Sequence, residues 1–514
     1  MKTSHWPKPY IAEIPIWDKK KGKVVFGSIE LWLPHEIIAA ICDFTDVENF
    51  LSKDNIDAEA AARLAKCARE LGVPLDELLG IGFWLDGCPC NWDRSQSLET
   101  VSMNFPYLGG EDNNFRIPLC GIEKGFVAKG KTFDAILEVL TWSLAMLAAK
   151  EWPSCRHDGT VWKPTDCWRS RKKGSLPIRA VLSEVRGDWQ MFKHVFRFPQ
   201  HNELAGICFK CTAVPADVRR PGTNADWRKP ERRLTIWSLV QRMLDRGLKP
   251  SPLLSAPCVS VETFLIDWLH AVDLGVLCDF LGNLFFYVVE HKLHQPNRKA
   301  RVAALFSLIL DYYKRHPEIE NKFDNLTCEM LRPDDSSTKP PKLRAKAAEA
   351  RGLVGFAVEL ADNLLSDHVA HEHTMKMAAG CMARCYSSLS ETSIFATDLL
   401  RENCRRFCTL YVALSDAFED PLFRVKPKMH FFQELCEMCG PTRPALHWTY
   451  RDEDFGGFVA KTARRRGGKH SVRAQSRMIL NRYAAKHRVP RFGERRIHSV
   501  QCRLGKCSLA CVYM

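Results

Sequence analysis

The order of apolar segments between residues 80 and 188 constrains the fold more than any other feature of this chain. Three short runs, each bounded by turn-like residues, predict successive strands over residues 80–87, 97–106 and 115–122. Apolar residues at helical spacing predict an amphipathic helix over residues 132–152, and residues 176–188 predict a fourth strand that ends on an acid. This order predicts an α/β core built around a mixed sheet.

Three strands, a helix and a strand closing on an aspartate are the order expected of an RNase H-like core. From about residue 205 to 440 the apolar residues follow helical spacing almost throughout. The predicted fold class is therefore α/β, with an RNase H-like mixed-sheet core interrupted by a large, mostly helical insertion. The predicted regions are an N-terminal mixed region, the core, the helical insertion, a terminal helix with a basic segment, and a tail: residues 1–78, 79–204, 205–440, 441–498 and 499–514.

Composition and cysteine usage indicate the compartment. The chain has 514 residues, of which 46% are hydrophobic, enough to bury a large core. The N-terminus lacks the apolar region of a signal peptide, and no uninterrupted apolar run reaches the roughly 18 residues of a membrane span. The 21 cysteines are an odd number, which favours reduced thiols with some available for metal. We expect an intracellular protein with no membrane partner.

The positive charge of the chain is concentrated near its C-terminus. The formal net charge is +14, and residues 461–496 hold 13 Lys or Arg against one acid, Glu494, which is +12. A charge run of mixed sign is usually a solvated helix face, but a run of one sign favours an anionic partner. We expect this segment to bind nucleic acid through Lys461, Arg464, Arg465, Arg466, Lys469, Arg473 and Arg477. Residues 461–470 also suit a nuclear localisation signal.

Three acids are candidates for a shared metal site. Asp86 ends the first predicted strand and Asp188 the fourth, so neighbouring strands would bring both carboxylates to one edge of the sheet. An acid from the run at 452–454 could complete the set. Carboxylates that converge repel one another unless divalent cations neutralise them, and Mg²⁺ or Mn²⁺ suits oxygen ligands. Taken alone, each aspartate is more often a turn or helix-cap residue, and Asp86-Gly87 is also a common hairpin turn.

Two further motifs carry candidate ligands. Cys208 and Cys211 have the CxxC spacing that places two thiolates on one Zn²⁺, and a tetrahedral site needs two more ligands. The histidines predicted for these two positions are His368 and His373, with His371 as an alternative. Asp267 and His270 lie at i and i+3, where they can hydrogen-bond on one helix face. Spacing alone favours a structural Asp–His pair there.

Taken together, these motifs resemble the cut-and-paste DDE transposases of eukaryotes. The resemblance rests on LDG (85–87), RGD (186–188), CxxC (208–211), DWLH (267–270) and the late acidic helix start, in that order. It is nearest the CACTA (En/Spm) group, especially the divergent copies of protists such as dinoflagellates, and covers roughly residues 80–480.

The resemblance implies a role for each motif. Asp86, Asp188 and Glu453 would be the catalytic acids that hold two Mg²⁺ or Mn²⁺ ions, with Asp452 and Asp454 as competitors for the third place and Asp93 for the first. Cys208 and Cys211 match a CxxC that shares zinc with two late histidines in related transposases. Asp267 and His270 match a (C/D)xxH motif that shapes the site.

The leading hypothesis is a nuclear DNA transposase that performs metal-dependent strand cleavage and transfer. Its partners would be the transposon ends and target DNA, with a homo-oligomer as a further option. One alternative is a catalytically inactive, transposon-derived protein that still binds nucleic acid. Another is a helical scaffold protein with an incidental zinc site. No sequence-specific DNA-binding domain is recognised in the N-terminal region.

Overall fold

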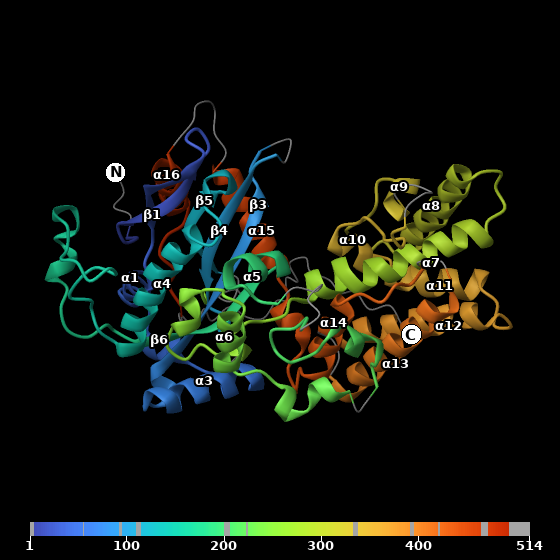
Figure 1. Cartoon of the computed structure of the whole chain (residues 1–514), viewed down its shortest axis with the longest axis horizontal. Coiled ribbons are helices and arrows are strands. Elements are labelled where there is room, and N and C mark those ends of the chain that lie inside the picture. The colour runs from blue at the N-terminus through green and yellow to red at the C-terminus, as the bar shows by residue number, and fades with distance from the viewer. Residues whose placement is uncertain are drawn as a thin grey trace, which may run out of the picture. The chain divides into compact units, whose positions relative to one another are not determined.

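The computed structural model describes residues 5–54, 56–91, 95–108, 115–199, 206–222, 225–332, 338–390, 395–419, 422–463 and 471–492. The chain forms two compact units, whose helices and strands are labelled in Figure 1. Unit 1 comprises residues 1–198, 234–265 and 449–497. Unit 2 comprises residues 199–233, 266–448 and 498–514. Unit 1 thus joins the N-terminal region and a late C-terminal segment to the predicted core.

A four-stranded mixed sheet forms the centre of unit 1, and the prediction of a mixed α/β fold is confirmed. The strand order is β5-β4-β3-β6, with antiparallel pairing among the first three strands and β6 parallel to β3. Nearly all residues of these strands are buried, which explains their continuous apolar runs. All four match predicted strands: β3 Leu78–Pro89, β4 Ser97–Asn104, β5 Arg116–Glu123 and β6 Arg179–Gly187.

Helices from distant parts of the chain pack against this sheet (Figure 1). The predicted helix after β5 is α4, Thr132–Ala149, which packs against β6. Helix α3, Ala58–Leu71, packs against β3 and β6 and ends at Gly72, whose left-handed φ of 65° terminates the helix. The late helices α15, Tyr450–Ala463, and α16, Val472–Lys486, pack against β3 and β5 respectively. Unit 1 also contains the shorter helices α5, Trp189–Phe196, and α6, Ile236–Asp245.

Helix α15 lies close to β3 because Gly456 has no side chain. Trp84 and Cys88 of β3 form a buried apolar cluster with Val459 of α15. A Cβ added at Gly456 would overlap the Cys88 sulfur and the Trp84 ring. The glycine therefore permits a close approach that brings the first turn of α15 to the end of β3.

The N-terminal region adds a hairpin and two helices to unit 1. Strands β1, Tyr10–Asp18, and β2, Lys23–Leu31, pair in antiparallel register. Helices α1, Pro34–Cys42, and α2, Val47–Leu51, follow. The sequence also predicts a strand at residues 22–34 and a helix at 37–44, and these correspond to β2 and α1. Strand β1 was not predicted.

Unit 2 is helical over most of its described residues, as predicted for the insertion. Helix α12 packs against α11 and α13, and α13 packs against α14. Residues Leu269–Leu277 are wound as a π-helix that leads into α7. The helices are α7 Cys278–His291, α8 Arg298–Arg315, α9 Cys328–Leu331, α10 Ala347–Gly352, α11 Val354–Leu364, α12 Ala370–Ser388, α13 Thr397–Ala417 and α14 Lys428–Glu437.

Two helices in the described part of the chain are long and apolar enough to cross a membrane by length and composition alone. They are Thr132–Ala149 and Leu269–His291. The second contains two aspartates, Asp273 and Asp279, among its apolar residues. Most of each helix is buried inside the protein, so core packing accounts for its apolar character.

Candidate functional site

The ends of β3 and β6 place the first two candidate acids at one edge of the sheet. Leu85 pairs with Gly187 in the parallel register, so Asp86 and Asp188 follow on adjacent strands. Adjacent strands run about 4.8 Å apart, so the two acids begin from neighbouring backbone positions. The expectation that these two strands are neighbours is confirmed.

Each aspartate also makes a local hydrogen bond of the kind expected for a turn or a helix cap. Oδ1 of Asp86 accepts from the backbone N–H of Gly87 at 2.6 Å, and the residue is 8% exposed. Oδ1 of Asp188 accepts from the N–H of Met191 at 2.6 Å and caps α5. These bonds orient both carboxylates, and each involves only one of the two carboxylate oxygens.

Glu453 is the acid of the 452–454 run that lies beside Asp86. A carboxylate oxygen of Glu453 is within 4.8 Å of one from Asp86. Asp452 is fully buried and forms ion pairs with Arg116 and, at 3.5 Å, with Arg186. Asp454 is exposed. The helix thus turns its three acids in different directions, and the structure brings the predicted Glu453 to the end of β3.

The two arginines give Asp452 a structural role, and Asp452→Asn is expected to destabilise unit 1. The substitution removes the negative charge between Arg116 and Arg186, which are both buried. Breaking a buried ion pair from one side costs about 3–5 kcal/mol of unfolding free energy. Chemical denaturation measures this loss. Asp454→Asn, at an exposed position of the same helix, should change stability by less than about 0.5 kcal/mol; equal stability of both variants would contradict this role.

A cavity of about 440 Å³ opens beside the two strand ends. Its acidic lining residues are Asp86, Glu99, Asp134 and Asp188, and its basic ones are Lys124, Lys129, His194 and Arg197. Burial raises the pKa of Glu99, Lys124 opposes that rise and Asp188 adds to it. Burial raises the pKa of the nearby Cys88 thiol, and the charges of Asp86 and Glu453 raise it further. The carboxylates of Asp86 and Glu453 thus lie close together at the sheet edge, where a divalent cation would neutralise their charge.

The second predicted pair, Asp267 and His270, is present in unit 2. Nδ1 of His270 lies 2.6 Å from Oδ2 of Asp267 and donates to it. The buried Asp267 carboxylate also accepts from the backbone N–H groups of Leu269 and His270, at 3.1 and 2.9 Å. The aspartate thus binds the first N–H groups of the π-helical segment and fixes the orientation of the imidazole.

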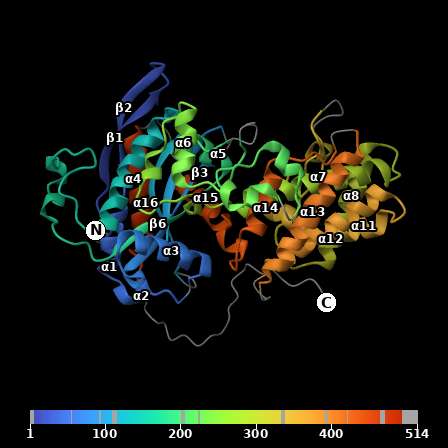
Figure 2. The ribbon, with the colours of Figure 1, turned by 60° about the horizontal axis from the view of Figure 1, so that its bottom comes forward.

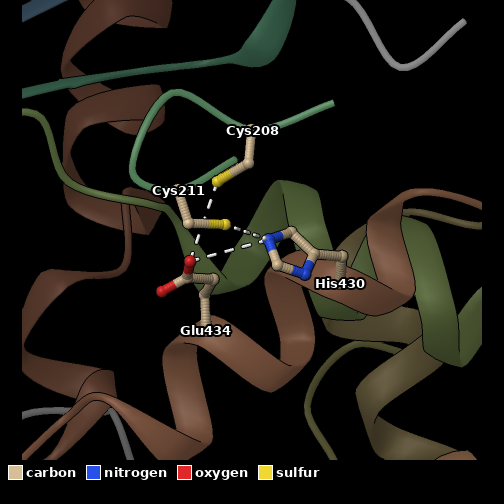
Figure 3. Close-up of side chains that lie close together, drawn as sticks. All are labelled: Cys208, Cys211, His430 and Glu434. Carbon is tan, nitrogen blue, oxygen red and sulfur yellow. Dashed lines mark hydrogen bonds and ion pairs between the residues drawn. The ribbon is translucent and has the colours of Figure 1, made fainter. Parts of the chain in front are cut away.

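A separate group in unit 2 has the ligand set of a metal centre. Cys208, Cys211, His430 and Glu434 each offer one ligand atom, and these four atoms lie within 4.8 Å of one another (Figure 3). Nε2 of His430 lies 3.3 Å from Sγ of Cys211 and 3.5 Å from Oε1 of Glu434. Oε1 of Glu434 lies 3.7 Å from Sγ of Cys208. All four residues are buried.

Local backbone geometry holds these ligands. The cysteines occupy a tight loop closed by the Ile207 N–H donating to the Ala213 carbonyl at 2.9 Å. The Lys210 N–H points at Sγ of Cys208 at 3.2 Å, which stabilises a thiolate. His430 and Glu434 are one turn apart on α14, so both face the loop.

The four groups shift one another's pKa values, as expected of titratable side chains buried together. Burial alone would raise the pKa of Cys208, but the Cys211 thiol and the His430 imidazole lower it to about 6. Burial would also raise the pKa of Glu434, but His430 and Arg233 lower it to about 2. Burial would lower the pKa of His430, yet Cys208 and Glu434 raise it to about 9. The Cys208 thiol and the Glu434 carboxyl thus lose their protons more readily, and the proton stays on the His430 imidazole.

The structure corrects the predicted histidine ligands. His368 is exposed, and Nδ1 of the exposed His373 lies 3.1 Å from Oδ1 of Asp367. The alternative, His371, bonds the Tyr287 hydroxyl at 2.8 Å. None of the three belongs to the ligand group, which instead contains His430. The sequence signal for His430 was a histidine inside the apolar run HFFQELC with a glutamate four residues later, but nothing in the sequence linked that helix to the CxxC loop.

The basic segment is described only in part. Arg473 and Arg477 of α16 are about half exposed, and both form ion pairs with Glu30 of β2, at 2.9 and 2.5 Å. Lys461 is exposed at the end of α15. The remaining predicted contacts, together with the rival acid Asp93, lie outside the described residues: Arg464, Arg465, Arg466 and Lys469.

No protein-family model matches the chain, and no curated protein matches its sequence.

Proposed function

We propose that unit 1 is an RNase H-like core that cleaves DNA phosphodiesters and transfers strands, as in a DDE transposase. The observation that carries the proposal is the approach of Asp86 and Glu453 to within 4.8 Å, from segments at opposite ends of the chain. The sheet order β5-β4-β3-β6, with β6 alone parallel to β3, supports it, because this order brings the fourth strand and its Asp188 beside Asp86.

Asp86, Asp188 and Glu453 fit a site for Mg²⁺ or Mn²⁺, since all three offer hard oxygen ligands. Two such ions, when bound, stabilise the attacking and leaving oxygens of a phosphodiester displacement. The chain's own residues hold and orient the site: Gly87 and Met191 fix the aspartates, and Gly456 lets α15 bring Glu453 close. Lys124 and Lys129 line the adjoining cavity, where a phosphate of the substrate would contact them.

In the same proposal, the group in unit 2 holds a structural zinc ion. Two thiols, one imidazole and one carboxylate are ligands that Zn²⁺ accepts, and four protein ligands leave no position for substrate. The ion would tie the CxxC loop to α14 and so stabilise unit 2. The arginine-bearing face of α16 and the neighbouring 464–470 segment would contact DNA in the nucleus.

The test is metal-dependent cleavage of supercoiled plasmid. We expect nicked and linear products with Mg²⁺ or Mn²⁺ and none with EDTA. Asp86→Asn and Asp188→Asn should abolish both products, because each removes a charge from the site. Asp76→Asn, at an exposed position of unit 1, is the matched control and should cleave like the wild type. Cleavage that persists in both site variants would exclude this assignment.

A further inference from the structure

The β1–β2 hairpin carries exposed lysines and apolar side chains that the packing of unit 1 does not explain. Its turn, residues 18–23, carries four lysines and one aspartate, a net charge of +3. The lysines are all exposed: Lys19, Lys20, Lys21 and Lys23. Figure 2 shows this hairpin standing out from the sheet and helices of unit 1. Charges of one sign at an exposed tip repel one another unless an anion binds there.

One face of the hairpin also exposes apolar side chains. Trp17 pairs with Val24 and Pro15 with Phe26, and residues that face each other across an antiparallel pair lie on the same side. Trp17 and Val24 are each 37% exposed, and Phe26 is 79% exposed. The opposite face packs inward through Ile14 and Ile29, which are fully buried. Exposed aromatic residues beside lysines are the combination that binds single-stranded nucleic acid by stacking on bases and pairing with phosphates.

Strand β1 is held to the rest of unit 1 close to the hairpin turn. Ile16 forms a β-bridge with Val127, and the Thr132 hydroxyl donates to the Pro15 carbonyl at 2.6 Å. The exposed face is thus held in place, which lowers the entropy lost on binding a ligand.

A shallow groove leads from this face toward the acidic site. Trp17 and Val24 line it together with Val127, Ala128, Lys129 and Lys131. Three of these residues, Val127, Ala128 and Lys129, also line the cavity that contains Asp86 and Asp188. The groove and the cavity therefore share a wall, and a strand that follows it would meet lysines at the hairpin and carboxylates at the sheet edge.

We infer that the β1–β2 hairpin and its groove bind a single-stranded DNA end and direct it to the site at Asp86. The lysines of the turn contact phosphates, and Phe26 and Trp17 stack on unpaired bases. This inference deepens the proposed function and rests on it, because it names the form of the substrate that the same site receives.

Fluorescence anisotropy with full-length protein and EDTA tests binding without cleavage. The probes are a fluorescein-labelled 20-mer of deoxythymidine and a 20-base-pair duplex. Changing all four turn lysines to Gln should weaken single-strand binding at least about tenfold and lower the slope of log K against log salt by about 3, at about 0.7 per phosphate contact. The control changes four exposed lysines elsewhere in unit 1 to Gln and should bind like the wild type: Lys66, Lys163, Lys173 and Lys249.

Phe26 tests stacking on bases. Its side chain is 79% exposed, so replacing it should leave the fold unchanged. Phe26→Leu should weaken single-strand binding about tenfold and leave duplex binding unchanged, whereas Phe26→Tyr should retain both. Wild-type affinity in the lysine variant would overturn the inference. The inference would also be overturned if the lysine variant lost duplex binding as much as single-strand binding and Phe26→Leu had no effect. The turn lysines would then contact duplex phosphates.

The outcome is separable from the failure of the proposed function. Hairpin-dependent binding by a wild-type protein that never cleaves DNA would refute the nuclease assignment and leave the binding surface established.

Discussion

Cys208→Ser is expected to leave the purified protein without zinc and to lower the melting temperature of unit 2 by about 8–16 °C. Structural zinc sites contribute up to about 10–16 kcal/mol to the folding of small domains. A loss of only about 4 kcal/mol in a unit of this size would produce the stated shift. The effect is large because all four ligands are buried, so the remaining thiol, imidazole and carboxylate would face one another without a cation.

Metal analysis and calorimetry of the same preparations provide the measurement. The wild type should contain one zinc ion per chain. His430→Ala should lose it, and His373→Ala should keep it, since His373 lies with Asp367 rather than with the thiols. Cys328→Ser, at a partly exposed cysteine of unit 2, is the matched control. A wild type without zinc, or a Cys208→Ser protein with unchanged metal content and melting temperature, would contradict the assignment.

Glu453→Gln is expected to reduce metal-dependent DNA cleavage by about 10³-fold or more. The substitution keeps the size and hydrogen-bonding capacity of the side chain but removes the charge that faces Asp86. Removing one residue from a catalytic group that acts as a unit commonly lowers the reaction rate by a factor of this size. Plasmid cleavage at saturating Mg²⁺ measures the rate, and calorimetric titration with Mn²⁺ measures the accompanying loss of affinity.

Asp454→Asn tests whether the effect belongs to the position or to the charge. It removes the same charge from the next residue of α15, but its side chain is exposed and does not join Asp86. We expect wild-type cleavage and Mn²⁺ affinity. Equal defects in Glu453→Gln and Asp454→Asn would mean that the net charge at the start of α15 decides the rate. A defect in Asp454→Asn alone would mean that Asp454, not Glu453, is the third acid.

Local patterns predicted most of the elements that build unit 1. Strands β3 to β6 were recognisable because each is short, apolar and bounded by turns, and α4 because its apolar residues recur at helical spacing. The sequence placed an acid at the end of β3 and of β6, and the structure shows that these two strands are neighbours. β1 was missed because Pro15 interrupts its pattern and its partner strand lies across a lysine-rich turn.

Long-range contacts set the limits of prediction at both candidate sites. Among Asp452, Glu453 and Asp454, the sequence offered three equivalent acids. Only the packing of α15 on β3, through Gly456, turns Glu453 toward Asp86 and buries Asp452 between two arginines. One residue along a helix is a rotation of about 100°, so helical phase against the sheet decides the role of each acid.

The sequence by itself determined the α/β class, the order of the strands in unit 1, and the helical character of the insertion, because these depend on residue spacing within short windows. It also identified Cys208 and Cys211 as a candidate ligand pair. Only the tertiary structure decided that His430 and Glu434, rather than His368 and His373, complete that group. Ligands more than 200 positions apart meet through the packing of loops and helices, and nothing in the local sequence around either partner encodes which distant segment will lie beside it.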